Sequence, residues 1–167
     1  MVKFRSNDTR GFTLLECLMA AAVLALAVAA ICQAIVAGQM STYDALYNER
    51  AVGLAESLME EILALPYDDP GGATVAGPEA GEVNRAAFDN IDDFHGYEED
   101  AGEQEDAAGD EYGETFQGFA RSVTAAYGNV FVTAFNRNVA GLTITVTVTD
   151  DAQRSWSIVR FVPEPVE

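Results

Sequence analysis

The sequence predicts an α+β fold in which a long N-terminal helix packs on a small antiparallel β-sheet. Two observations lead to this prediction. Residues 12–65 contain no proline and begin with an apolar run, which favours one long helix. Residues 142–149 alternate strictly between aliphatic side chains and threonine, the pattern of a strand with one buried face. A glycine-rich acidic stretch separates these two parts.

The charge of the chain is concentrated in its middle. A length of 167 residues permits one domain, or one domain with an appendage, and the net charge is −18. Residues 1–11 carry a net charge of +2, residues 66–115 carry −15, and residues 116–167 are neutral. Such an acidic chain lacks the basic surface that displaces phosphate counterions, so we expect no nucleic-acid partner.

Residues 12–37 have the length and composition of the membrane-spanning half of a helix. All of them are apolar except Thr13, Glu16 and Gln33, and a span needs roughly 20 mostly apolar residues. The basic segment 1–11 favours a cytoplasmic N-terminus, with the rest of the chain across the membrane. The alternative is a cleaved secretory signal, but the apolar core of such a signal is only about 7–15 residues long.

Glu16 is the unusual residue of this apolar segment. A carboxylate inside a membrane helix is costly and is by default a sign of function. Two interpretations are open from the residue alone. Glu16 either lies at the interface, where it reaches water, or has a functional partner.

The apolar run begins with the motif RGFTLLE, residues 10–16, behind a short basic segment. In this it resembles the prepilin family, which comprises type IV pilins and the pseudopilins of type II secretion systems. The resemblance implies a leader over residues 1–11, cleavage between Gly11 and Phe12 by a prepilin peptidase, and N-methylation of Phe12. It also implies that Glu16 pairs with the positively charged N-terminus of a neighbouring subunit during assembly.

The same resemblance implies where the protein works and with what. It predicts a single-pass protein of the bacterial inner membrane whose C-terminal domain lies in the periplasm and which then enters a filament or filament tip. The implied partners are the prepilin peptidase, other pilin or pseudopilin subunits, and the inner-membrane assembly platform. The implied fold is the pilin fold, a long helix on an antiparallel sheet.

Residues 38–65 are predicted to continue the helix outside the membrane. Apolar side chains recur every three or four residues between Leu46 and Leu65, and most acidic residues fall outside this stripe. Pro66 stops the helix. A coiled coil would need a sustained seven-residue repeat, which is absent, so we expect the stripe to pack on the sheet.

Residues 66–118, here called the acidic tract, are predicted to form a loop region with too little apolar surface to fold alone. Three interpretations of its acidic side chains are open. The tract is a solvated loop, or it binds calcium, which prefers several hard oxygen ligands, or His95 serves as a metal ligand or base. Asp92, Asp93 and Glu98 are the calcium candidates, although the spacing of an EF-hand loop is absent. No other cofactor is expected.

Residues 119–167 are predicted to form the antiparallel sheet. We expect strands over residues 119–127 and 130–135, joined near Gly128-Asn129, and over residues 139–150 and 154–162, joined by a turn.

No constellation of catalytic residues is recognisable, so we expect no enzymatic activity. The chain has a single histidine and no Ser/His/Asp set, metal signature or phosphate-binding loop. The favoured function is a structural subunit, a minor pilin or pseudopilin, because residues 16–20 (ECLMA) resemble the corresponding residues of minor subunits. The alternatives are a major filament subunit and a membrane-anchored module that binds calcium or a basic partner.

Overall fold

The computed structural model describes residues 11–70, 72, 75–134 and 136–165. The chain divides into two compact units, Met1–Ala45 and Leu46–Glu167. Most of the predicted leader, residues 1–10, lies outside the described residues. The two units are treated one after the other.

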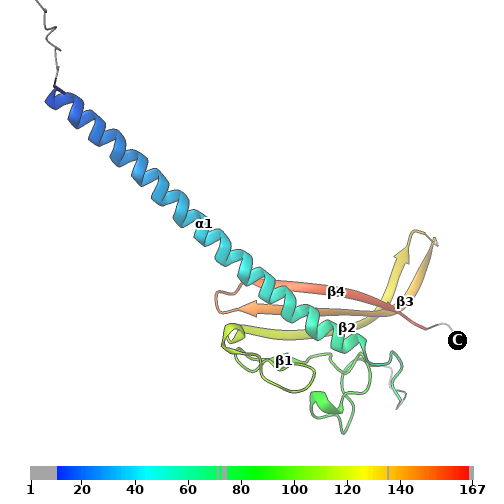
Figure 1. Ribbon diagram of the computed structural model, residues 1–167. Coiled ribbons are helices and arrows are strands. Elements are labelled where there is room, and N and C mark those ends of the chain that lie inside the picture. Colours follow the sequence, from blue (N-terminus) through cyan, green and yellow to red (C-terminus); the bar gives the residue numbers. More distant parts are fainter. Residues whose placement is uncertain (1–10, 71, 73–74, 135, 166–167) are drawn as a thin grey trace, which may run out of the picture. The chain divides into compact units, whose positions relative to one another are not determined.

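Helix α1 runs from Leu14 to Leu63 (Figure 1). Its residues in the first unit are exposed along their whole length, although most of them are apolar. Among the described residues, α1 is the one helix that is long and apolar enough to cross a membrane. Fully exposed aliphatic side chains on a single helix are unfavourable in water and favourable in a bilayer.

The second unit combines the end of α1 with a four-stranded antiparallel sheet (Figure 1). Its strands are β1 (Glu98–Glu99), β2 (Phe119–Val132), β3 (Arg137–Asp150) and β4 (Ser155–Pro163), in the spatial order β1-β2-β3-β4. The predicted α+β arrangement is confirmed.

The hydrophobic core of the second unit lies between α1 and the sheet. The helix buries a stripe of six side chains spaced three or four residues apart or adjacent: Ala51, Leu54, Ala55, Leu58, Met59 and Ile62. On β3, the aliphatic side chains of the alternating pattern point into the core and are fully buried: Leu142, Ile144, Val146 and Val148. The intervening threonines are only half-buried. Each large aliphatic side chain in such a core contributes about 1.5–3 kcal/mol.

The predicted break in the second strand is wrong. Gly128-Asn129 is a common turn sequence, but here it lies inside β2, where Gly128 pairs with Gly141 and Asn129 pairs with Ala140. The strand continues because β3 begins as early as Arg137 and provides backbone partners up to Val132. The chain reverses after Val132 instead, where Asn136 adopts a φ of 48°, a left-handed conformation that asparagine tolerates.

The acidic tract is not uniformly solvated. It contains β1 and two short 3₁₀ helices, η1 (Arg85–Ala87) and η2 (Glu114–Phe116). Ile91 and Phe94 are part of the core. Acidic side chains that the composition placed in solvent are buried as well, among them Asp92, Asp93 and Glu99.

A buried ion-pair network formed by Glu61, Arg85, Glu99 and Arg121 links the tract to α1 and the sheet. Arg85 donates from Nε to Glu61 at 2.6 Å and from NH1 to Glu99 at 3.2 Å. Arg121 is fully buried, donates to Glu99 at 2.8 Å and donates to the carbonyl of Glu105 at 2.7 Å. Arg121 therefore pairs with the acidic tract in the interior of the unit and not on its surface.

Candidate functional site

Gly11 and Phe12 lie immediately before α1, in a segment without regular secondary structure. Both are exposed, Phe12 to 86%. A Cβ atom added at Gly11 would meet no other atom within 4 Å. Within the described part of the first unit, the peptide bond between the two residues is thus accessible.

Thr13 and Glu16 cap the first turn of α1 reciprocally. The Thr13 hydroxyl accepts a hydrogen bond from the backbone N–H of Glu16 at 3.2 Å. The backbone N–H and the hydroxyl of Thr13 both donate to Glu16 Oε2, each at 2.9 Å. This arrangement is the capping box, in which the backbone N–H of each residue donates to the side chain of the other, so that two N–H groups without helical partners are both satisfied. It explains why the helix begins at Leu14 and not at Phe12.

The capping box leaves half of the Glu16 carboxylate free. Both hydrogen bonds end on Oε2, and Oε1 has no hydrogen-bond partner within the described part of the chain. Thr13 was not singled out in the sequence, although its spacing of three residues from a glutamate ahead of an apolar run is a recognised signal for such a box.

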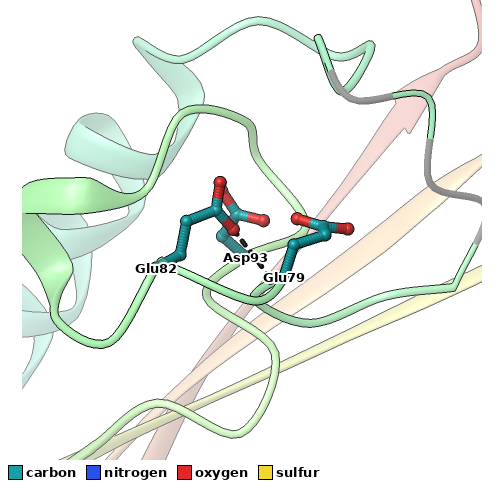
Figure 2. Close-up of side chains that lie close together, drawn as sticks. All are labelled: Glu79, Glu82 and Asp93. Atoms are coloured by element: carbon teal, nitrogen blue, oxygen red, sulfur yellow. Dashed lines mark hydrogen bonds between the residues drawn. The ribbon is translucent and has the colours of Figure 1, made fainter.

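Three carboxylates of the acidic tract converge at a second place. Glu79, Glu82 and Asp93, here called the carboxylate cluster, each offer one oxygen, and these oxygens lie within 4.8 Å of one another. Figure 2 shows Glu79 and Glu82 side by side on one loop, with Asp93 reaching them from a neighbouring segment. Glu79 and Glu82 are half-buried and Asp93 is fully buried.

A tight turn places the two glutamates next to each other. The backbone N–H of Glu82 donates to the carbonyl of Glu79 at 3.1 Å, and the N–H of Glu79 donates to Glu82 Oε2 at 2.8 Å. Gly81 closes the turn with a φ of 128°, which favours glycine.

Crowding of negative charge raises pKa values in and beside this cluster. The pKa of Glu79 is raised to about 7, first by a hydrogen bond with the Glu82 carboxyl group, then by burial and by the charges of Asp69, Glu82 and Asp93. Burial, together with Glu82, Asp93 and Asp69, also raises the pKa of Asp89.

The structure brings together one of the three calcium candidates with two residues that the sequence did not single out. Asp93 belongs to the carboxylate cluster, whereas Asp92 and Glu98 do not. Asp92 is buried and accepts a hydrogen bond from the Tyr127 hydroxyl. Glu98 is exposed on β1, where its backbone pairs with that of Ser122. The turn sequence Gly-Pro-Glu-Ala-Gly-Glu, residues 77–82, was the available signal for Glu79 and Glu82.

His95 makes a structural contact with the sheet and is not a member of the carboxylate cluster. Its Nδ1 accepts a hydrogen bond from the backbone N–H of Ala125 at 3.1 Å. This bond joins the acidic tract to β2. A second bond does the same, because the N–H of Gly96 donates to the carbonyl of Val123 at 3.0 Å.

Comparison with known families gives one match. Residues 6–31 match the family model described as the prokaryotic N-terminal methylation motif. Comparison with curated proteins and with solved structures finds no match. The matched range contains the Gly11–Phe12 bond, the capping box of Thr13 and Glu16, and the first turns of the apolar helix. The N-terminus of the chain thus carries the methylation motif of type IV prepilins, and the long apolar helix that follows fits that motif.

Proposed function

We propose that this protein is a minor pilin or pseudopilin, a structural subunit of a type IV pilus or of a type II secretion-like filament. The observation that carries the proposal is the methylation motif at residues 6–31, which leads directly into a helix whose exposed side chains are apolar. In this function the helix first anchors the subunit in the inner membrane, with the second unit in the periplasm. It then packs among the helices of other subunits.

Processing requires an accessible bond between Gly11 and Phe12. The exposure of both residues and the open space around the Gly11 Cα support cleavage there by a prepilin peptidase. Cleavage creates a charged amine on Phe12, which N-methylation leaves positive. It also removes the basic leader and leaves the capping box intact, because the backbone N–H of Thr13 is still an amide.

Assembly through Glu16 follows from the cost of charges in a membrane. A carboxylate and an amine that are each unfavourable in hydrocarbon become tolerable when they pair. Because Glu16 Oε1 has no partner within the described chain, it is available to the N-terminal amine of a neighbouring subunit. The lone subunit then carries a penalty that incorporation into a filament relieves.

The concentrated acidity supports a minor rather than a major role. The tract of residues 66–115 carries a net charge of −15, and such a charge repeated along a filament would repel itself unless it were neutralised. A subunit present in few copies avoids this repulsion. Residues 16–20 (ECLMA) also resemble the corresponding segment of minor subunits.

Processing is tested by expressing the full chain with a prepilin peptidase and sequencing its N-terminal peptide by mass spectrometry. We expect a peptide that begins with N-methylated Phe12. Gly11→Val should retain residues 1–11, because the peptidase must accommodate the residue before the cut. Gly38→Val is the matched control, since Gly38 also has no neighbour within 4 Å but lies far from the cut. It should be processed normally.

Two results would contradict the proposal. One is an intact leader on the unaltered chain while a known prepilin is cleaved in the same cells. Such retention would favour a membrane-anchored binding module. The other is a high copy number in sheared filaments, which would make the protein a major subunit.

A further inference from the structure

We propose that Glu79, Glu82 and Asp93 form a calcium site in the second unit, a property independent of the filament function proposed above. The first observation is their convergence, with one oxygen from each carboxylate lying within 4.8 Å of the others (Figure 2). Calcium binds oxygen ligands at 2.3–2.6 Å, so two ligands on opposite sides of the ion are separated by up to about 5 Å. The measured spacing fits within that limit.

The second observation is a buried oxygen that has no partner. Asp93 is 0% exposed, and its Oδ2 accepts hydrogen bonds from the backbone N–H groups of Asp89 at 2.8 Å and Asn90 at 3.1 Å. Its Oδ1 is buried and has no hydrogen-bond partner among the described residues, and the same is true of Glu79 Oε2. A buried carboxylate oxygen without a partner is costly, and a cation held between the three carboxylates would satisfy it.

Within the described ranges, no arginine or lysine forms an ion pair with the carboxylate cluster. The ion pairs of the described residues engage Arg85, Arg121 and Arg154, and none of them involves a member of the carboxylate cluster. The further charges that act on Glu79 come from Asp69, Glu82 and Asp93, all acidic. The described surroundings of the cluster therefore attract a cation, and no described side chain is paired with the cluster in its place.

Asp93 is held in position by the core. Asn90 Oδ1 accepts hydrogen bonds from the backbone N–H groups of Asp92 at 2.8 Å and Asp93 at 3.1 Å. Ile91 is buried, and its N–H donates to the carbonyl of Pro66 at 3.0 Å. One ligand thus comes from a fixed segment, while the two glutamates come from a half-buried turn that water can reach.

This combination favours calcium over magnesium. Calcium accepts six to eight oxygen ligands in flexible geometry and completes its shell with water or backbone carbonyls. Magnesium requires a smaller, nearly octahedral shell at 2.0–2.1 Å and gives up its water reluctantly. Three carboxylates on a turn and a loop do not impose that geometry.

The site is tested on the full-length chain in detergent micelles after treatment with a chelator. Calcium chloride is titrated by isothermal calorimetry, and unfolding of the second unit is followed by the fluorescence of Trp156, the only tryptophan. We expect one calcium per chain with a Kd of about 1 mM or below. We also expect a rise in melting temperature with calcium, and binding of magnesium that is at least about tenfold weaker.

Variants assign the binding to these residues. Glu79→Gln and Glu82→Gln should each weaken calcium binding by about tenfold or more, because calcium affinity depends on the number of charged ligands. They should also remove the rise in melting temperature. Both residues are half-buried, so their variants test the site even where Asp93→Asn fails to fold. Glu98→Gln removes an exposed carboxylate of the same tract and should bind calcium as the unaltered chain does.

Two outcomes would overturn the proposal. The first is no saturable calcium binding by the unaltered chain. The second is binding that Glu79→Gln and Glu82→Gln leave unchanged, which would assign it to the diffuse charge of the acidic tract. Neither outcome bears on processing at Gly11, so failure of the calcium site and failure of the filament function can be distinguished.

Discussion

At the start of α1, one carboxylate has both a local and an intermolecular task. Glu16 closes the capping box with Thr13 through Oε2, while the pairing proposed for assembly needs its negative charge. The local task needs only an acceptor oxygen, which glutamine also provides in capping boxes. The two tasks can therefore be separated by substitution.

We predict that Glu16→Gln is processed normally but enters filaments poorly, because the substitution keeps the cap and removes the charge. Thr13→Val is the counterpart. It removes the capping hydroxyl, at a cost of about 1 kcal/mol to the helix end, keeps the carboxylate, and should assemble. The measurement is the amount of each processed variant in sheared filaments. Equal incorporation of Glu16→Gln and the unaltered chain would remove the charge of Glu16 from the assembly mechanism.

At the scale of elements, the pairing of β3 with β4 depends on a close approach at Gly141. This residue pairs with Gly128 on β2 and with Pro163 on β4. A Cβ atom at Gly141 would lie 2.3 Å from the carbonyl oxygen of Val162 and 2.7 Å from the ring of Phe161. At Gly128, directly opposite, it would meet nothing within 4 Å. The two glycines therefore have different reasons to be present.

We predict that Gly141→Ala destabilises the second unit by about 1–3 kcal/mol, the usual cost of overpacking, because backbone of β4 must move. Gly128→Ala should leave stability unchanged or slightly increase it, since alanine restricts the unfolded chain. Thermal unfolding of the full chain in detergent, followed by Trp156 fluorescence, gives the comparison. Equal melting temperatures for the two variants would contradict the close approach of β4.

For the molecule as a whole, the distribution of charge has two consequences. The acidic tract cannot form a core by its composition, yet it buries Asp93 and Glu99 against the sheet and helix. Glu99 is buried there because Arg85 and Arg121 pair with it inside the buried ion-pair network, whereas Asp93 accepts hydrogen bonds from the backbone N–H groups of Asp89 and Asn90. Burial, and after it the Glu99 carboxylate, raises the pKa of Tyr97 to about 12, while the nearby Arg85 guanidinium acts to lower it.

We predict that Arg121→Met destabilises the second unit by about 3–5 kcal/mol, the cost of leaving one partner of a buried pair without the other. Arg160→Met is the control, because Arg160 is exposed on β4 and should cost little. The readout is again thermal unfolding of the full chain followed by Trp156. A melting temperature for Arg121→Met equal to that of the control would show that the network contributes nothing.

Features that depend on residues close together in the chain follow from the sequence alone. The RGFTLLE motif, the apolar run after it and the alternation of residues 142–149 each have a fixed local spacing, and they predicted the prepilin motif, the long helix and the central strand. The stripe on the outer half of α1 predicted which helix face is buried, for the same reason.

Tertiary structure decided what depends on partners far apart in the chain. Gly128-Asn129 has the composition of a turn, and only the extended pairing of β2 with β3 keeps it in a strand. Asp93 could be named from acidic density, but its meeting with Glu79 and Glu82 depends on how two loop segments pack. Burial of Glu99 likewise depends on arginines at 85 and 121. Contacts between charged side chains do not recur at a fixed spacing in the sequence. The composition of the tract therefore predicted that its acidic side chains are solvated, whereas Glu99 is buried and paired with arginines.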